Sequence, residues 1–263
     1  MSDQLTYGSY LRVDDLLALQ QERSDPPHHD ELLFIIIHQV YELWFKQLLH
    51  ELDAVVAHLD AGDLLKVNKS FRRIDAVQRL IETQIDVLET MTPQEFNAFR
   101  ERLNPASGFQ SAQFREIEYL CGARAGSSSR FLEPTAAERE RLDRRLAEPS
   151  LYDALKRLLA RSGFAVDSSE TLLQTFKTIY ERSDVHYALY LLLEEFIEFD
   201  ERFLLWRGRH VRMVERMIGM KPGTGGSLGV AYLQKTLDKK FFPELWEVRT
   251  LLGAPAEAAS ETP

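Results

Sequence analysis

The chain has 263 residues, of which 44% are hydrophobic and 28% are charged, a composition typical of a globular protein with a substantial core. The net charge of −9 at pH 7 disfavours nucleic-acid binding, because such proteins neutralise phosphates with clustered lysine and arginine. The longest apolar runs, such as residues 32–37 and 188–193, are far shorter than the roughly 20 residues that a membrane-spanning helix needs. No membrane-spanning segment is therefore expected.

The compartment can be inferred from the N-terminus and the cysteine content. The first residues contain neither a basic nor an apolar stretch, so a signal peptide is not expected. Cys121 is the single cysteine, and it cannot form an intrachain disulfide. Both features predict a protein of the reducing cytoplasm.

Three helices are predicted in the first part of the chain. Over residues 30–59 apolar side chains recur every three or four positions, which predicts a long helix with one buried face and with Asp30 as its N-cap. The same spacing predicts a second helix over residues 63–90. A third should start at Thr92, because a capping threonine, a proline and Glu95 follow in the order of a capping box, and should end before Pro105.

The second half of the chain is also predicted to be helical. The pattern indicates an exposed charged helix over residues 136–146, two helices over 169–180 and 185–219, and a short helix that ends at Leu237. Residues 122–129 form a Gly/Ser-rich connection, and the small, polar tail 254–263 is expected to be disordered. No segment has the pattern of a strand. The fold class is therefore all-α, with a single domain over residues 1–253.

Most of the seven histidines are expected to be ordinary surface residues, and none has a zinc-binding spacing such as HExxH. His38 differs, because it follows an apolar run and lies one helical turn after Phe34. From position alone, a core histidine bonded to a backbone carbonyl is favoured over a catalytic one.

His210 lies late in the longest predicted helix and is followed by Met213, Val214 and Met217 on neighbouring turns. A rigid helix with apolar surroundings is what an axial haem ligand requires. Nearby arginines could neutralise haem propionates: Arg207, Arg209 and Arg212. A histidine near a helix end among solvated arginines is the equally acceptable alternative.

Two further features could bind a small anion or a substrate. Arg100 lies one turn after Phe96 and next to Phe99, so it is either a carboxylate clamp or a surface arginine over aromatic rings. Residues 223–226 read Gly-Thr-Gly-Gly, which allows close backbone approach to a ligand and adds the hydroxyl of Thr224. The order of residues is not that of a phosphate-binding Walker loop, and a flexible turn is the alternative.

Taken together, several long segments resemble the tryptophan 2,3-dioxygenase family. The resemblance covers most of the chain outside residues 123–185, and blocks of this length in one order are far more specific than a short motif. The matching blocks are LTYGSYL (5–11), HDELLFIIIHQVYELWFKQLLHEL (29–52), ETMTPQEFNAFRERLNPASGFQSAQFREIEYLCG (89–122), WRGRHVRMVERMIGMKPGTGGSLGVAYL (206–233) and FFPELWEVRTLL (241–252).

The resemblance implies a bundle of long helices that encloses a haem pocket. It also implies an enzyme that cleaves the indole C2–C3 bond of L-tryptophan with O₂ to give N-formyl-L-kynurenine, the first step of the kynurenine pathway. His210 would be the proximal ligand of haem b, and His38 would be the catalytic residue near the indole. The implied substrate-binding residues are Phe34, Ile35, Ile36, Ile37, His38, Phe96, Phe99, Arg100, Ser107, Gly108 and Thr224.

The family assembles as a homotetramer, a dimer of dimers, and this too is implied here. Tyr7 and Tyr10 match tyrosines that reach a neighbouring subunit's substrate pocket, so residues 1–28 would complete a second site. Two residues depart from many bacterial members, Phe96 in place of tyrosine and Ile37 in place of glutamine, and both are expected to make the pocket more apolar.

Three alternatives stay open at this point. A related haem enzyme could hydroxylate or mono-oxygenate an aromatic amino acid or indole with the same histidine. A non-catalytic haem sensor or carrier would need no carboxylate clamp. A plain helical interaction protein would not bind haem at all.

Overall fold

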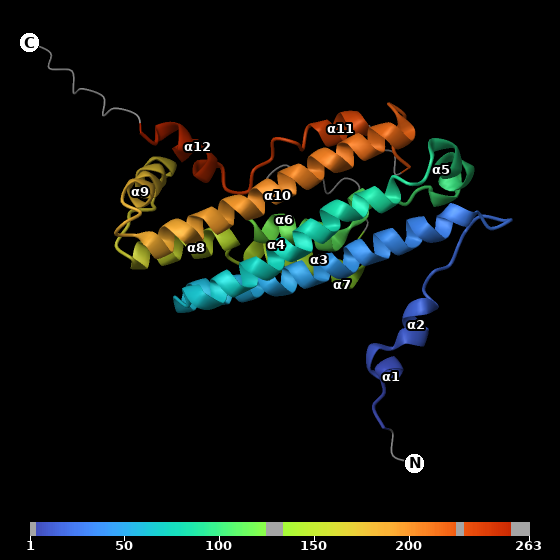
Figure 1. The fold of residues 1–263 in the computed structure, drawn as a ribbon, viewed down its shortest axis with the longest axis horizontal. Coiled ribbons are helices and arrows are strands. Elements are labelled where there is room, and N and C mark those ends of the chain that lie inside the picture. Colours follow the sequence, from blue (N-terminus) through green and yellow to red (C-terminus); the bar gives the residue numbers. More distant parts are fainter. Residues whose placement is uncertain (1–3, 125–133, 225–228, 254–263) are drawn as a thin grey trace, which may run out of the picture.

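The computed structural model describes residues 4–124, 134–224 and 229–253, and within these ranges the secondary structure is helical with no strand. Three long helices form the frame: α3 (His29–Ala61), α4 (Leu64–Leu88) and α10 (Tyr187–Ile218). They run side by side, with α4 packed against both of the others (Figure 1). The all-α fold class is confirmed.

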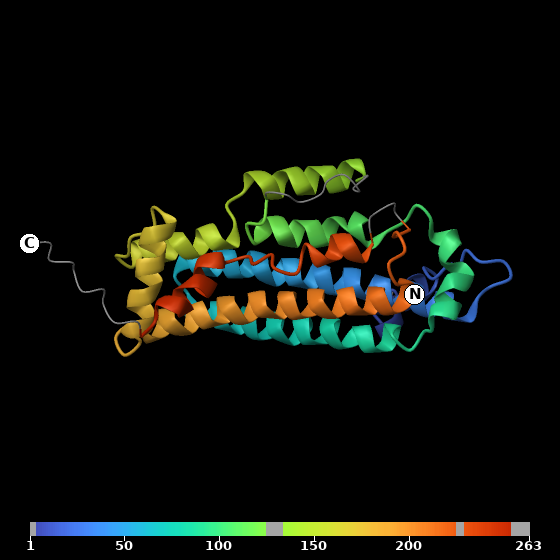
Figure 2. The same cartoon turned by 90° about the horizontal axis from the view of Figure 1, so that it is seen from above.

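Shorter helices cover this frame on its sides and ends. In Figure 2, α6 and α7 lie over one side of the long helices. At one end α9 crosses the bundle and packs against α12, while α5 and α11 lie near the other end of α10 (Figure 1). The shorter elements are α1 (Tyr7–Leu11), α2 (Val13–Leu17), α5 (Pro93–Phe99), α6 (Ala112–Leu120), α7 (Ala136–Ala147), α8 (Leu151–Arg161), α9 (Ser169–Glu181), α11 (Val230–Gln234), α12 (Pro243–Leu251) and the 3₁₀-helices η1 (Arg100–Leu103) and η2 (Gly108–Gln110).

The hairpin of α3 and α4 shows how local sequence sets the frame. Gly62 ends α3 with a φ of +72°, a conformation that glycine adopts without the steric cost of a Cβ. Asp63 then caps α4 by accepting a hydrogen bond from the Lys66 amide at 3.2 Å. The two helices therefore turn back on each other within two residues.

By length and composition, α3 is apolar enough to cross a membrane. Leu48, Leu52, Val55 and Leu59 are nevertheless completely buried in the main core of the bundle. Only 22% of the most apolar 18-residue window of α3 is buried inside the structure. Length and composition alone do not separate a core helix from a membrane-spanning one, and a single candidate of this kind is weak evidence for a membrane.

The C-terminal segment is fastened to α10 by one buried carboxylate. Asp200 accepts hydrogen bonds from the backbone amides of Phe241 (2.9 Å) and Phe242 (3.1 Å) and from the indole of Trp246 (3.0 Å). Burial raises the pKa of Asp200, and the three donors oppose that shift. These contacts fix the chain that follows α11 along the bundle.

The N-terminal segment has a different character. Both α1 and α2 project away from the bundle (Figure 1), and neither contains a buried residue. Large apolar side chains are exposed there: Leu5, Tyr7, Tyr10, Leu11, Leu16, Leu17 and Leu19. Within one chain, this segment has almost nothing to pack against.

The predicted boundaries were largely confirmed, with some corrections. Asp30 is not the N-cap of α3, because His28 is the last extended residue and its ring accepts from the Asp30 amide at 3.3 Å. The charged helix α7 is not wholly exposed, since Leu142 and Arg145 are buried. The last short helix ends at Gln234, before the predicted Leu237.

Five helices were not predicted: α1, α2, α6, α8 and α12. Most of the Gly/Ser-rich connection and the whole tail 254–263 lie outside the described residues, as do Gly225 and Gly226.

Candidate active site

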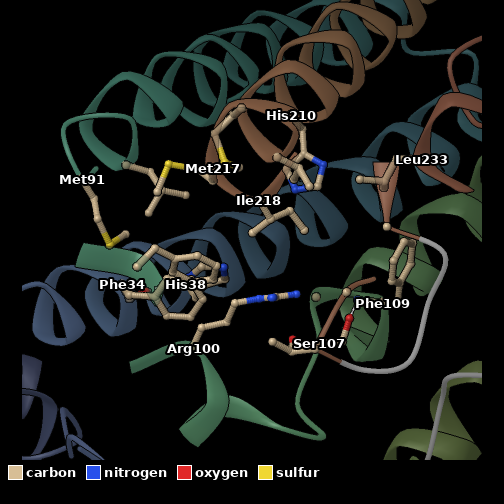
Figure 3. Close-up of a pocket in the computed structure, with 18 residues that line it drawn as sticks. Phe34, His38, Met91, Arg100, Ser107, Phe109, His210, Met217, Ile218 and Leu233 are labelled. Atoms are coloured by element: carbon tan, nitrogen blue, oxygen red, sulfur yellow. Dashed lines mark hydrogen bonds between the residues drawn. The ribbon is translucent and has the colours of Figure 1, made fainter. Parts of the chain in front are cut away.

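Two adjoining cavities, of about 180 and 610 Å³, lie near the end of the bundle where α3, α5, α10 and α11 meet. They share several wall residues, among them Phe34, His38, Phe96 and His210. The larger volume is within the roughly 300–1,000 Å³ of small-molecule and cofactor sites. Methionine and aliphatic side chains supply much of the smaller cavity's wall (Figure 3): Leu88, Met91, Met213, Val214, Met217, Ile218 and Leu233.

His210 projects from α10 into this space (Figure 3). Burial, and after it the proximity of His38, lowers the pKa of His210 to about 4, so the imidazole is neutral near pH 7. Among the described residues, none forms a hydrogen bond with either ring nitrogen. A neutral imidazole with an uncommitted nitrogen can bind a metal ion.

His38 lines both cavities from α3. Its Nδ1 lies 2.7 Å from the Phe34 carbonyl, and because a carbonyl can only accept, Nδ1 carries the hydrogen and Nε2 carries a lone pair. Water in the cavity can reach the ring, yet the surrounding protein still lowers the pKa of His38, with burial as the main cause. His38 is therefore a neutral hydrogen-bond acceptor beside the cavity.

An aromatic cluster forms the wall next to His38. The Phe34 ring lies 4.1 Å from the His38 ring, 5.6 Å from Phe96 and 5.8 Å from Phe99, measured between centroids. Phe34 and Phe96 line the cavities, whereas Phe99 is fully buried behind them. Phe99 therefore supports the wall without forming part of its surface.

The other wall consists of two chain segments that are distant in sequence. Arg100 donates from Nη2 to the carbonyl of Pro222, and Thr224 donates from Oγ1 to the carbonyl of Ala106 at 2.7 Å. Ser107 and Gly108 complete this wall. The Nε of Arg100 is buried and has no hydrogen-bond partner among the described residues. The guanidinium thus retains donor capacity next to the smaller cavity (Figure 3).

Six expected substrate-binding residues do not line the cavities, among them Phe99, which lies behind the aromatic wall. Ile35 and Ile36 are partly or largely exposed, and Ile37 packs into the core beside the cavity, where its carbonyl accepts from Gln84 at 2.8 Å. Ile37 therefore adds to the apolar packing behind the pocket wall and not to the wall surface, and its effect on the pocket stays a prediction. Tyr7 and Tyr10 are exposed on α1, away from the site of their own chain.

The three arginines around His210 are already engaged. Arg209 pairs with Asp86, and Arg212 is exposed and pairs with Glu215 at 3.1 Å. Arg207 is buried, donates to the Lys239 carbonyl at 2.5 Å and lies 3.5 Å from Glu118. The expectation that these arginines could neutralise an anionic cofactor stays a prediction; of the three, Arg207 lines the larger cavity, and its Nη2 is buried without a hydrogen-bond partner among the described residues.

Several wall residues were not identified from the sequence. Phe109 lies in η2 and packs edge-on against Tyr232, at 5.0 Å between centroids. Tyr41 and Trp206 line the larger cavity, but their spacing is that of ordinary core positions. Nothing in the sequence distinguishes a core position from a position beside a cavity.

Comparison with known proteins places this arrangement in a family. The family model described as tryptophan 2,3-dioxygenase matches residues 1–182 and 167–252. A tryptophan 2,3-dioxygenase of Nocardioides sp. is 51% identical over 254 residues, which is 95% of either chain. The Herpetosiphon aurantiacus enzyme of the same name is 50% identical over 95% of this chain and 99% of its own, and that of Myxococcus xanthus is 43% identical over 97% and 92%. The chain therefore belongs to the tryptophan 2,3-dioxygenase family.

Proposed function

We propose that this chain is a haem-dependent enzyme that cleaves the indole C2–C3 bond of L-tryptophan with O₂ to give N-formyl-L-kynurenine. The observation that carries the proposal is that His210 and Arg100 line one cavity from different elements, with apolar side chains between them. Such a site provides a metal ligand at one wall and an anion-binding group at another. The names of the relatives supply the reaction.

The residues present fit a haem. Among the described residues, no three His, Cys, Asp or Glu side chains group together. His210 would therefore hold a prosthetic group that brings its own metal ligands, as haem does. Trp206, Val211 and Met213, which lie close to His210 in sequence, line the larger cavity. Their apolar side chains suit an apolar macrocycle. When bound, haem b would supply the binding and activation of O₂.

His38 is proposed to orient the indole. Its Nε2 lone pair can accept a hydrogen bond from the indole N–H, because Nδ1 is committed to the Phe34 carbonyl. The low pKa of His38 also makes it a weak base, and an indole N–H is a very weak acid, so proton abstraction by this residue is unfavourable. Phe34 and Phe96 would hold the flat face of the indole.

Arg100 and Thr224 are proposed to bind the amino-acid end of the substrate. A guanidinium forms its strongest contacts with carboxylates, often through two parallel hydrogen bonds. The hydroxyl of Thr224 donates to Ala106 and can still accept from an ammonium group. Fixing both ends of the substrate places the indole against the metal side of the cavity, and such positioning can contribute about 7–11 kcal/mol in ideal systems.

We further propose that the enzyme is a cytoplasmic homotetramer, a dimer of dimers. The exposed tyrosines of α1 support this, because Tyr7 and Tyr10 have no role in the site of their own chain. In the assembly, residues 1–28 of one subunit would reach the pocket of its neighbour.

A direct assay tests the proposed function. The chain is loaded with haem b, reduced and mixed with L-tryptophan in air, and N-formylkynurenine is followed by absorbance and mass spectrometry. A product that has gained two oxygen atoms is expected. Gain of a single oxygen atom would instead assign the chain to the mono-oxygenase alternative, which no comparison favours. His210→Ala should lose both the Soret band and turnover.

A further inference from the structure

Trp206 stacks on His210. The two residues lie four positions apart on α10 and therefore share one face of that helix. Their ring centroids are 5.5 Å apart, and the ring planes are inclined by only 16°. This is the offset, nearly parallel arrangement that aromatic pairs favour.

The Trp206 ring is itself held in place by a cage of aromatic side chains. Rings from α3, α6 and α10 approach it at steep or intermediate angles, with centroid distances between 5.4 and 6.5 Å. The members of this cage are Tyr41, Phe45, Phe114 and Phe203. A ring packed on several sides has few rotamers available, so the indole plane is well defined.

Tyr41 connects this cage to a third helix. Its hydroxyl donates to the Ile81 carbonyl of α4 at 2.8 Å, which leaves the phenol oxygen free to accept. Burial raises the pKa of Tyr41 to about 12, and the Trp206 indole opposes that shift. The Trp206 N–H is buried without a hydrogen-bond partner among the described residues, and the Tyr41 ring lies 6.2 Å from the Trp206 ring between centroids.

The plane of the His210 ring also has to be set. A metal-binding histidine almost always donates its second ring N–H to a carboxylate, a carbonyl or water, and that bond sets the plane of the ring. No described side chain or carbonyl offers such an acceptor to His210. The stacked indole is the one aromatic ring recorded against it among the described residues.

We propose that Trp206 is a positioning residue for His210, fixing the plane of the imidazole by stacking while Tyr41 and the surrounding rings hold the indole still. This inference rests on the proposed function, in which His210 is the haem ligand. It assigns Trp206 no contact with substrate and no step of the reaction. Its effect is on the orientation and strength of the bond between His210 and the iron.

The test uses the iron–histidine stretching band of the reduced, haem-loaded protein, measured by resonance Raman spectroscopy, together with haem affinity. Trp206→Leu removes the stacked ring and should shift and broaden the band and weaken haem binding about 10- to 100-fold, the range seen when groups that orient a metal ligand are removed. Trp206→Phe keeps a flat ring and should restore a narrow band. Trp206→Met, which is unstacked but long, replaces the leucine variant if that protein does not fold.

Trp44→Leu is the matched control, because Trp44 is partly buried against the same core but lines neither cavity. It should leave the band and the haem affinity unchanged. A band that is unaltered in the unstacked variants, or altered equally by Trp44→Leu, overturns the inference while leaving the proposed function intact. If the haem spectrum of the His210→Ala variant equals that of the wild-type protein, both this inference and the proposed function are overturned.

Discussion

Removal of the Arg100 guanidinium is the most informative change at the substrate side of the site. In the structure this group lines the smaller cavity and donates to the Pro222 carbonyl, and its Nε is buried without a hydrogen-bond partner among the described residues. Arg100→Ala should therefore leave the carboxylate of bound L-tryptophan without its counter-charge.

The size of the effect follows from these contacts. Breaking a buried ion pair by removing one partner costs roughly 3–5 kcal/mol. Because one nitrogen of Arg100 is already committed to Pro222, the lower end of this range applies, about 3 kcal/mol or roughly 150-fold in affinity. The haem side of the cavity is formed by α10, so haem uptake should hardly change.

The assay is a spectral titration of the haem-loaded protein with L-tryptophan and with tryptamine, which lacks the carboxylate. The wild-type protein should prefer L-tryptophan strongly, and the Arg100→Ala variant should bind both ligands about equally. Arg102→Ala is the control, since Arg102 is exposed on the same 3₁₀-helix and lines neither cavity. Loss of haem from Arg100→Ala, or a variant that still prefers the carboxylate, would refute the clamp.

Three further predictions concern other parts of the site. His38→Ala should slow turnover roughly 2- to 13-fold without abolishing it, because one hydrogen bond contributes about 0.5–1.5 kcal/mol. Gly229→Ala should raise the KM for L-tryptophan and lower the Tm by a few degrees, because a Cβ at this φ of +60° would lie 2.5 Å from the Lys221 carbonyl oxygen, strain the backbone by about 1–2 kcal/mol and displace the loop that carries Thr224. The haem-free protein should lose up to about 3 kcal/mol of its unfolding free energy as the pH falls from 6.5 towards 4, because the pKa of His210 is lowered to about 4 and the unfolded state binds the proton first.

Each of these predictions has an outcome that contradicts it. Complete loss of turnover in His38→Ala, with haem and substrate still bound, would make that residue an obligatory base. An unchanged KM in Gly229→Ala would show that the loop tolerates the added methyl group. For the pH dependence, urea unfolding of the haem-free protein is compared with that of His210→Phe, and equal slopes in the two proteins would exclude His210 as the cause.

The helices were predictable wherever one local signal was strong. Thr92, Pro93 and Glu95 form the predicted capping box, in which both reciprocal hydrogen bonds are present. The long α3 followed from its apolar spacing. By contrast, α8 has a strongly amphipathic sequence and a Ser150 cap, signals comparable to those of the helices on either side of it, yet it was not predicted.

Predictions for the site were accurate for single residues and less accurate for runs of consecutive residues. Phe34 and His38 are one helical turn apart and both face the cavity, but the three isoleucines between them point elsewhere, because a helix presents only one face to a given space. The engagement of Arg207 by Glu118 of α6 and by Lys239, which lies between α11 and α12, depends on segments that are distant in sequence. Such pairings follow from the packed structure and not from local pattern.

The pairing of Arg100 with Pro222 and of Thr224 with Ala106 joins segments more than one hundred positions apart, whereas His210 is carried on a continuous helix of 32 residues. The two halves of the site therefore differ in how much of the tertiary structure they require. Mild denaturant, or a cut in a surface loop, should abolish recognition of the amino acid before it releases the cofactor. A preparation that still shows its full colour can accordingly have lost its substrate specificity, so pigment content alone is a poor measure of intact enzyme.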